Sequence, residues 1–186
     1  MTATLAPDWM PDGGFDRPAR AAAVLIALVR RGEELSVLYT ERSPELRSHS
    51  GQVAFPGGKI DPDDDGPGAA ALREAAEEVA LDPADARILG YLPAYYTGSN
   101  YMITPVVAEV RPRAPFVPNP GEVESVFEVP LERLMQEQSF GTFRIRRNDV
   151  EHTTWQIAHE GQLIWGITAN LTRRLYELVL RSEAAA

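Results

Sequence analysis

Two apolar runs near the start of the chain are separated by a short polar stretch. The runs cover residues 21–29 (AAAVLIALV) and 35–40 (LSVLYT), and the stretch RRGEE between them is typical of a turn. The first run is far shorter than the roughly 20 residues of a membrane-spanning helix. We therefore predict a β-hairpin whose first strand is buried.

Further along, segments rich in branched and aromatic residues alternate with segments rich in helix formers, which predicts a mixed α and β structure. Strands are expected at residues 52–55, 86–97, 101–110, 124–130, 139–145 and 152–166, with turns at 148–149 and 160–161. Helices are expected at residues 69–81, 131–136 and 167–184. The last helix should bury an apolar stripe formed by Leu171, Leu175, Leu178 and Val179.

The helix expected at residues 69–81 carries an unusual group of acids. On a helical wheel Glu74, Glu77 and Glu78 fall within an arc of about 100°. The opposite, core-facing side is expected to consist of Ala69, Leu72, Ala76, Val79 and Ala80. One interpretation is a solvated outer face. The other is a site for hard cations with oxygen ligands, because the preceding Gly57-Gly58 turn lets the backbone approach a ligand closely.

The composition limits which ligands, surfaces and metal sites are expected. The chain of 186 residues has a formal net charge of -9, an apolar share of 44% and no cysteine. The negative charge argues against binding to nucleic acid or to anionic membranes, since both need a positive field. It leaves room for an anionic small molecule bridged to carboxylates by divalent cations. Without cysteine, any metal must be bound by oxygen or histidine ligands.

The first residues differ in composition from the rest of the chain. Residues 1–20 mix Pro, Gly, Asp and Arg without a continuous hydrophobic segment, which does not match a secretory signal. We therefore expect a loose N-terminal arm at residues 1–20, a single domain at residues 21–186 and a cytoplasmic location. No oligomeric state is predicted.

Residues 57–81 (GGKIDPDDDGPGAAALREAAEEVAL) resemble the Nudix box, most specifically at REAAEE. The resemblance implies an α/β/α sandwich with a mixed central sheet, and hydrolysis of nucleoside diphosphates linked to another moiety with Mg2+ or Mn2+. It also implies that Glu74, Glu77 and Glu78 are metal ligands, the last two also serving catalysis. Arg73 is implied to orient an acid through an ion pair.

Three positions depart from the usual box. The first acid is Asp64 instead of Glu, and the loop before Arg73 is one residue longer than usual. Ala80 stands where Gly is usual, so the turn after the helix must either avoid a positive φ or carry modest strain. None of these departures touches the three glutamates.

Residues 38–59 (LYTERSPELRSHSGQVAFPGGK) and 164–171 (IWGITANL) resemble motifs of the coenzyme A pyrophosphatase branch of this family. This implies cleavage of coenzyme A, or a derivative, to 3',5'-ADP and 4'-phosphopantetheine. The assigned substrate-binding residues are Arg42, Arg47, Gly57, Gly58 and Lys59. The arginines suit a polyanion, although either could form a structural ion pair instead. We expect His49 to pack or hydrogen-bond within its loop.

Glu122, which follows a Pro-Gly turn in NPGEVES, is the candidate general base. A helix glutamate could fill that role, and Glu122 could be a plain surface residue. Two other functions stay open: a Nudix hydrolase for another substrate such as NADH or ADP-ribose, or a non-catalytic nucleotide-binding Nudix module. The complete set of three glutamates argues against the second.

Overall fold

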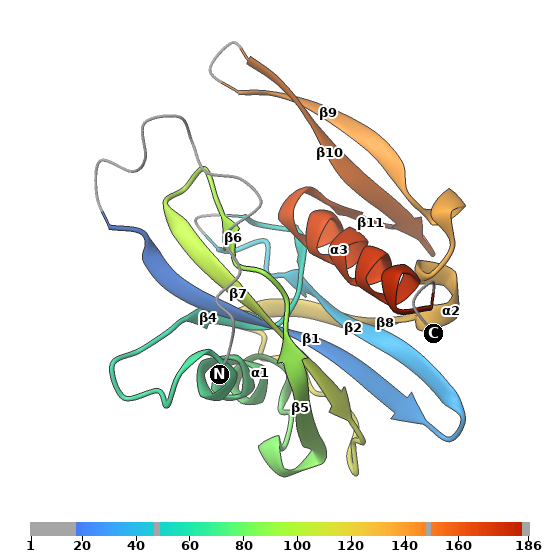
Figure 1. Ribbon diagram of the computed structural model, residues 1–186. Helices are drawn as coiled ribbons and strands as arrows, with labels where there is room; N and C mark the ends of the chain where they lie inside the picture. The colour runs from blue at the N-terminus through green and yellow to red at the C-terminus, as the bar shows by residue number, and fades with distance from the viewer. Residues whose placement is uncertain (1–17, 47–48, 148–149, 184–186) are drawn as a thin grey trace.

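The computed structural model describes residues 18–46, 49–147 and 150–183 (Figure 1). Most of the expected N-terminal arm, residues 1–17, lies outside this part, as do Arg47 and the turn expected at 148–149. Within the described residues, no helix has the length and apolar character needed to span a bilayer.

A mixed β-sheet forms the centre of the molecule. Its main path runs β3 (Val53–Ala54), β2 (Glu34–Arg42), β1 (Arg20–Arg31), β7 (Tyr101–Val110) and β5 (Ala86–Tyr91). Three further strands extend it: β4 (Gly57–Lys59) pairs with β1, β6 (Tyr95–Tyr96) with β7, and β8 (Val123–Pro130) with β2. Strands β1 and β7 are parallel, whereas the other pairs are antiparallel. The predicted mixed central sheet is therefore confirmed.

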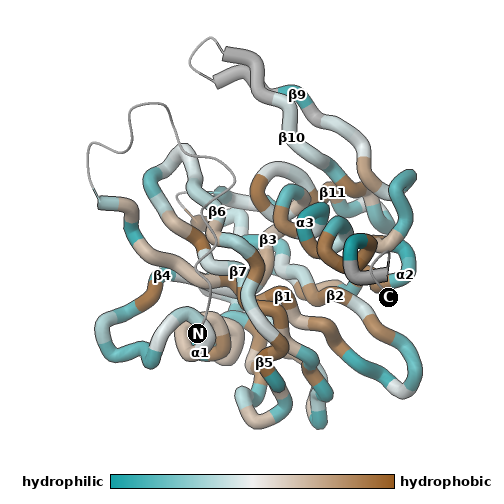
Figure 2. Tube along the Cα trace, in the orientation of Figure 1, coloured by the Kyte–Doolittle hydropathy of each residue, from teal (hydrophilic) through white to brown (hydrophobic). Residues whose placement is uncertain are grey.

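Helices cover both faces of the sheet. Along β1, Leu25 belongs to the buried apolar cluster beneath α1 (Pro67–Val79), and Ile26 to the cluster beneath α3 (Gly166–Glu183). Successive side chains of a strand point to opposite faces, so this alternation builds two cores from one strand. Figure 2 shows apolar residues along the inner strands and polar residues on the outer loops. The sandwich predicted from the family resemblance is confirmed.

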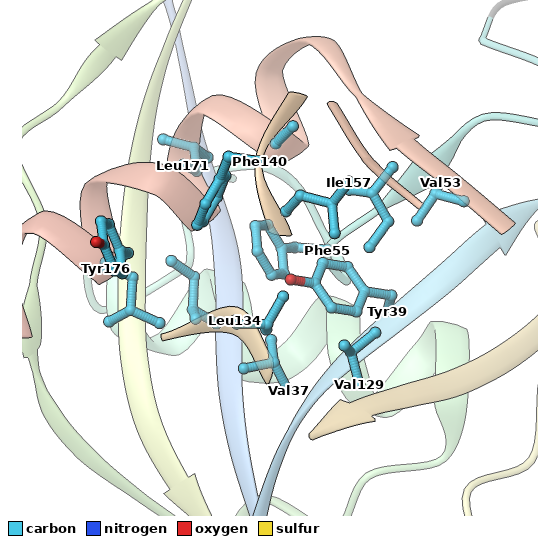
Figure 3. Close-up of a cluster of buried hydrophobic side chains, with 14 of the residues drawn as sticks. Val37, Tyr39, Val53, Phe55, Val129, Leu134, Phe140, Ile157, Leu171 and Tyr176 are labelled. Carbon is cyan, nitrogen blue, oxygen red and sulfur yellow. The ribbon is translucent and has the colours of Figure 1, made fainter. Parts of the chain in front are cut away.

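A second, three-stranded sheet lies beside α3. It consists of β9 (Gly141–Arg147), β10 (Val150–His159) and β11 (Gln162–Trp165), with β10 in the middle. The connection from β8 contains α2 (Leu131–Leu134) and the 3-10 turn η2 (Glu137–Ser139), and a similar turn, η1 (Pro83–Asp85), follows α1. Ile157 of β10 packs into the same cluster as Tyr39 and Phe55, whose rings stack 5.0 Å apart (Figure 3). The α3-side core thus joins the two sheets.

The expected elements are confirmed with a few differences. The strand expected at 86–97 is divided into β5 and β6, and Pro93 between them cannot donate a ladder hydrogen bond. Gly57 and Gly58 were expected to form a turn but lie in strand β4. The stripe predicted for the last helix is wrong at Leu178, which is 53% exposed, because Tyr176 takes a place in the core.

The buried face of α1 is also not the predicted one. Its buried apolar residues are Gly68, Ala70, Ala71, Ala75 and Val79, whereas Ala69, Leu72 and Ala76 are half-buried and Ala80 is exposed. The helix lies very close to the sheet, since a Cβ on Gly68 would come within 2.7 Å of Ile88 Cδ1. A helix this close to the sheet has room only for small side chains on its buried face. The helical-wheel prediction placed the larger Leu72 on that face.

Helix α1 ends in a strained residue. Ala80 has φ 55°, in the left-handed region, and its N–H caps the carbonyls of Ala75 and Ala76. Of the two outcomes expected for this Ala, the strained one is therefore present. A left-handed conformation costs a residue with a Cβ about 1–2 kcal/mol, a cost that glycine does not carry.

We expect Ala80→Gly to stabilise the protein by about 1 kcal/mol, which raises Tm by about 2–4 °C in a domain of this size. The matched control is Ala76→Gly, one turn earlier in ordinary helical conformation, which should lower Tm because Gly is unfavourable inside a helix. Calorimetric melting of both variants measures the difference. An Ala80→Gly variant that melts below the parent would contradict the strain argument.

Candidate active site

The site forms where the start of β4 meets the acidic side of α1. The Gly57 N–H donates to Glu78 Oε2 at 3.2 Å. A Cβ on Gly58 would overlap the Glu74 carboxylate, and one on Gly57 would overlap the Ala23 carbonyl. Gly57 therefore requires glycine, because a side chain would push β4 away from β1, whereas a side chain at Gly58 would displace the Glu74 carboxylate.

Glu78 is buried, which corrects the expectation that all three helix acids face away from the core. The residue is 3% exposed, and burial is the main cause that raises the pKa of its carboxyl to about 7. The Gly57 N–H and the Arg42 guanidinium act in the opposite direction. The compact packing of α1 against the sheet turns this position inward, next to the β3–β4 segment.

Arg42 lies on the sheet side of Glu78. Its Nη1 is 3.9 Å from Glu78 Oε1, which is a loose ion pair. Its buried Nε finds no hydrogen-bond partner among the described residues. The neighbouring segment is fixed by backbone bonds, since Arg42 N donates to Gln52 O. Arg42 therefore retains hydrogen-bonding capacity beside the most buried acid of the site.

Arg73 organises the other side of the carboxylate group. It makes a bidentate pair with Asp64, Nε–Oδ1 at 3.0 Å and Nη2–Oδ2 at 2.9 Å. The same guanidinium contacts Glu74 at 3.1 Å, Glu77 at 3.4 Å and the Lys59 carbonyl at 3.1 Å. The hydrogen bonds from Arg73 lower the pKa of Asp64. Asp64 was not among the predicted site residues, although its place as the first acid of the box was the available signal.

Glu122 comes close to these acids from a distant loop. The Glu78 carbonyl accepts from Asn119 N, and the Glu122 carbonyl accepts from Ser43 N, so the loop is tied to both α1 and the end of β2. The negative charge of Glu122 contributes to raising the pKa values of Glu74 and Glu78. Its side chain is exposed. The Asn119 connection was missed by the sequence analysis.

The carboxylates have the chemistry of a cation site without a preformed cage. Among the residues that the structure describes, no three Asp, Glu or His side chains converge closely enough to enclose a metal ion. Burial is the main cause that raises the pKa of Glu74, and the charges of Glu77 and Glu122 add to it. A divalent cation would relieve this crowding, and Mg2+ commonly binds through one or two carboxylates plus water. The donor set therefore fits a hard cation.

The remaining predicted residues are placed as follows. Lys59 lies in β4 with an exposed side chain, and Arg47 is outside the described residues. His49 Nδ1 lies 2.8 Å from Gln52 Oε1, so the hydrogen bond expected within its loop is present. The described structure brings together both glycines, Arg42, Arg73 and the helix acids.

A separate hollow of about 380 Å3 lies between α3, β6 and the β9–β10 hairpin. Tyr95, Trp155, Asn170, Arg173 and Arg174 are among its lining residues. None of the α1 carboxylates contributes to it. The acids and arginines described above therefore converge at a place distinct from this hollow.

The raised pKa of Glu78 makes a prediction about stability in the metal-free protein. Because the folded pKa of about 7 exceeds the ordinary value of 4.5, stability is lost as pH rises from about 4.5 through 7. Glu78→Gln removes this titration, so its advantage in Tm over the parent should grow by roughly 5 °C or more between pH 5 and pH 8.

The matched control is Glu124→Gln, which removes a charge from an exposed residue of β8. Its difference in Tm from the parent should stay nearly constant over the same pH range. Melting curves in chelator at several pH values provide the measurement. A constant difference for Glu78→Gln would show that Glu78 titrates normally.

Comparison with known proteins agrees with this geometry. The sequence model of the NUDIX domain matches residues 19–148. Proteins described as "Uncharacterized Nudix hydrolase NudL" from Yersinia pestis (strain Pestoides F) and Yersinia pseudotuberculosis serotype O:1b (strain IP 31758) are each 41% identical over 165 residues. The match covers 89% of this chain and 82% of each relative.

Solved structures share the fold. A Nudix hydrolase from M. smegmatis, RenU, superposes with a TM-score of 0.60 at 20% identity and 92% coverage of both chains. DR0079 from Deinococcus radiodurans superposes with a TM-score of 0.55 at 18% identity, covering 89% of this chain and 88% of that one. Fold, box and relatives agree, and the chain belongs to the Nudix family of hydrolases, which act on nucleoside diphosphate derivatives and generally use divalent metal ions.

Proposed function

We propose that this Nudix hydrolase cleaves the diphosphate of coenzyme A, or a derivative, into 3',5'-ADP and 4'-phosphopantetheine. The observation that carries the proposal is the position of the upstream motif, residues 38–59. Its Arg42 and its Gly57-Gly58 end lie directly against the acids of the Nudix helix, with Arg42 3.9 Å from Glu78. The segment that resembles the coenzyme A branch is thus adjacent to the carboxylates to which we assign the family's chemistry.

We assign the metal to Glu74, Glu77 and Glu78, with Mg2+ or Mn2+ as the ion. When bound, the ion supplies neutralisation of phosphate charge and a lower pKa for a bound water. Arg73 holds Glu74 and Glu77 from one side, and the Gly57 N–H holds Glu78 from the other. The protein therefore restrains these carboxylates from two sides, and a bound cation would draw them together.

The polyanionic substrate is assigned to the cations and glycines around these acids. Arg42 has a buried Nε that no described residue pairs and only a loose contact with Glu78, so its guanidinium retains donors for a phosphate. Lys59 and Arg47 provide further positive charge in the same motif. Gly57 and Gly58 contribute by letting β4 lie against β1 and beside the Glu74 carboxylate, which keeps the backbone of this motif next to the acids.

We assign the general base to Glu122. It is exposed, lies near Glu74 and Glu78, and comes from a loop tied to both sides of the site. A carboxylate in this place can accept the proton of the attacking water. Glu77 and Glu78 are the alternative acceptors, but a carboxylate occupied by metal and hydrogen bonds is a poorer base.

A substrate panel tests the proposal directly. With Mg2+ or Mn2+, coenzyme A should give a kcat/KM at least about tenfold above those of ADP-ribose and NADH, corresponding to about 1.4 kcal/mol of differential transition-state binding. Products should be identified by mass spectrometry, since 3',5'-ADP reports the bond that is cleaved. Faster turnover of ADP-ribose or NADH would reject coenzyme A as the substrate.

The role of Glu78 is tested by turnover. Glu78→Gln keeps size and helix propensity but replaces an anionic ligand with a neutral amide, so kcat should fall at least about a hundredfold. The increase in Tm that Mn2+ causes in the parent should be lost as well. Glu124→Gln, the same change at an exposed position of β8, should leave kcat and the Mn2+-induced increase in Tm unchanged. Near-parental turnover of Glu78→Gln at saturating metal would show that Glu78 is not a metal ligand that catalysis needs.

A further inference from the structure

The start of α3 sends a polar group into the apolar core. The helix follows β11 at Gly166, whose φ of 64° suits glycine, within the motif IWGITANL. Two residues later, the Thr168 hydroxyl donates to the Val53 carbonyl at 2.9 Å. Thr168 is 8% exposed and Val53 5% exposed, so the hydrogen bond is buried.

This hydrogen bond is the end of a longer buried series. Thr172 Oγ1 donates to the Thr168 carbonyl at 2.9 Å and lies 3.0 Å from the Tyr39 hydroxyl. Tyr39 and Thr172 have no exposed surface. Polar groups in an apolar core are costly unless each one is paired, so such a series favours one relative position of its elements. Here the elements are β2, α3 and β3.

Val53 is connected to the active site through a short stretch of chain. Strand β3 has two residues and pairs with β2 only at Thr40 and Glu41. Three residues after β3 the chain reaches Gly57, whose N–H holds Glu78. Residues 53–58, the β3–β4 segment, are held by this short ladder at one end and by the pairing of β4 with β1 at the other, where Leu25 N donates to Pro56 O. Thr168 adds an anchor from the α3 layer at the Val53 end.

We propose that Thr168 is a positioning residue for the active site. Its hydroxyl fixes the Val53 carbonyl and thereby sets how closely the β3–β4 segment approaches α1, which determines whether Gly57 reaches Glu78. Thr168 touches neither the carboxylates nor a substrate and acts through this segment. The inference rests on the proposed function only in taking Glu78 as a metal ligand, and it holds for any nucleoside diphosphate substrate.

The chain offers a matched control on the same helix. Asn170 Oδ1 accepts from Thr154 Oγ1 at 2.9 Å and from Trp155 N at 3.2 Å, and its Nδ2 donates to the Tyr95 hydroxyl at 2.9 Å. These hydrogen bonds tie α3 to β10 and β6 instead of to the β3–β4 segment. Loss of the Asn170 side chain should therefore weaken the fold without moving Gly57.

The experiment compares Thr168→Val, Thr168→Ser and Asn170→Leu with the parent. Isothermal titration with Mn2+ alone should show a three- to tenfold weaker affinity for Thr168→Val, about the change expected from one hydrogen bond, and kcat should fall by a similar factor. Thr168→Ser retains the hydroxyl and should stay within about twofold of the parent in both. Asn170→Leu should melt at a lower temperature with Mn2+ affinity and kcat within about twofold.

Two outcomes would overturn the inference. A Thr168→Val variant with lower Tm but parental Mn2+ affinity and kcat would show that the hydroxyl serves stability alone. A parent chain that binds no Mn2+ would remove the premise that these carboxylates hold a cation. A parent that binds Mn2+ but prefers another substrate over coenzyme A would contradict the proposed substrate only, because the Mn2+ comparison would still decide the role of Thr168.

Discussion

The close contact between two glycines and the acidic side of α1 is the constraint on which the site depends. The Gly57 N–H reaches the buried Glu78 carboxylate, and Gly58 leaves just enough room for the Glu74 carboxylate. This contact needs a helix that lies close to the sheet. Small residues along α1, with Gly68 against Ile88, make that approach possible. Packing and chemistry therefore require the same short distance between helix and strand.

Electrostatics at the site reflects a balance between burial and fixed positive charge. Burial opposes ionisation of Glu78, whereas the Gly57 N–H and Arg42 favour it. Arg73 divides its hydrogen bonds among Asp64, Glu74 and Glu77, and so compensates the acids on the solvent side. The repulsion among several acids in one part of the helix is thus reduced by one arginine of the same helix and by groups outside it. A bound cation would complete the compensation.

The support for this site extends through both layers of the sandwich. The loop that carries Glu122 is tied to the α1 carbonyl of Glu78 and to Ser43 after β2. On the opposite side, Thr168 of α3 holds Val53, which precedes Gly57 and Gly58 of β4. Residues far apart in sequence therefore determine the position of a short, irregular segment. Such outer support is what keeps the directly acting groups in place.

The sequence by itself determined the order and type of most elements, because strand and helix periodicity and turn residues are local properties. REAAEE, with the glycines before it, also sufficed to locate the candidate site. Tertiary structure decided which side of α1 is buried, since the close helix–sheet contact favours Ala and Gly over Leu72 and turns Glu78 inward. It likewise decided that Asp64 pairs with Arg73, that Tyr176 replaces Leu178 in the core, and that Glu122 approaches Glu78. These outcomes depend on distances between segments remote in sequence, which no local pattern encodes.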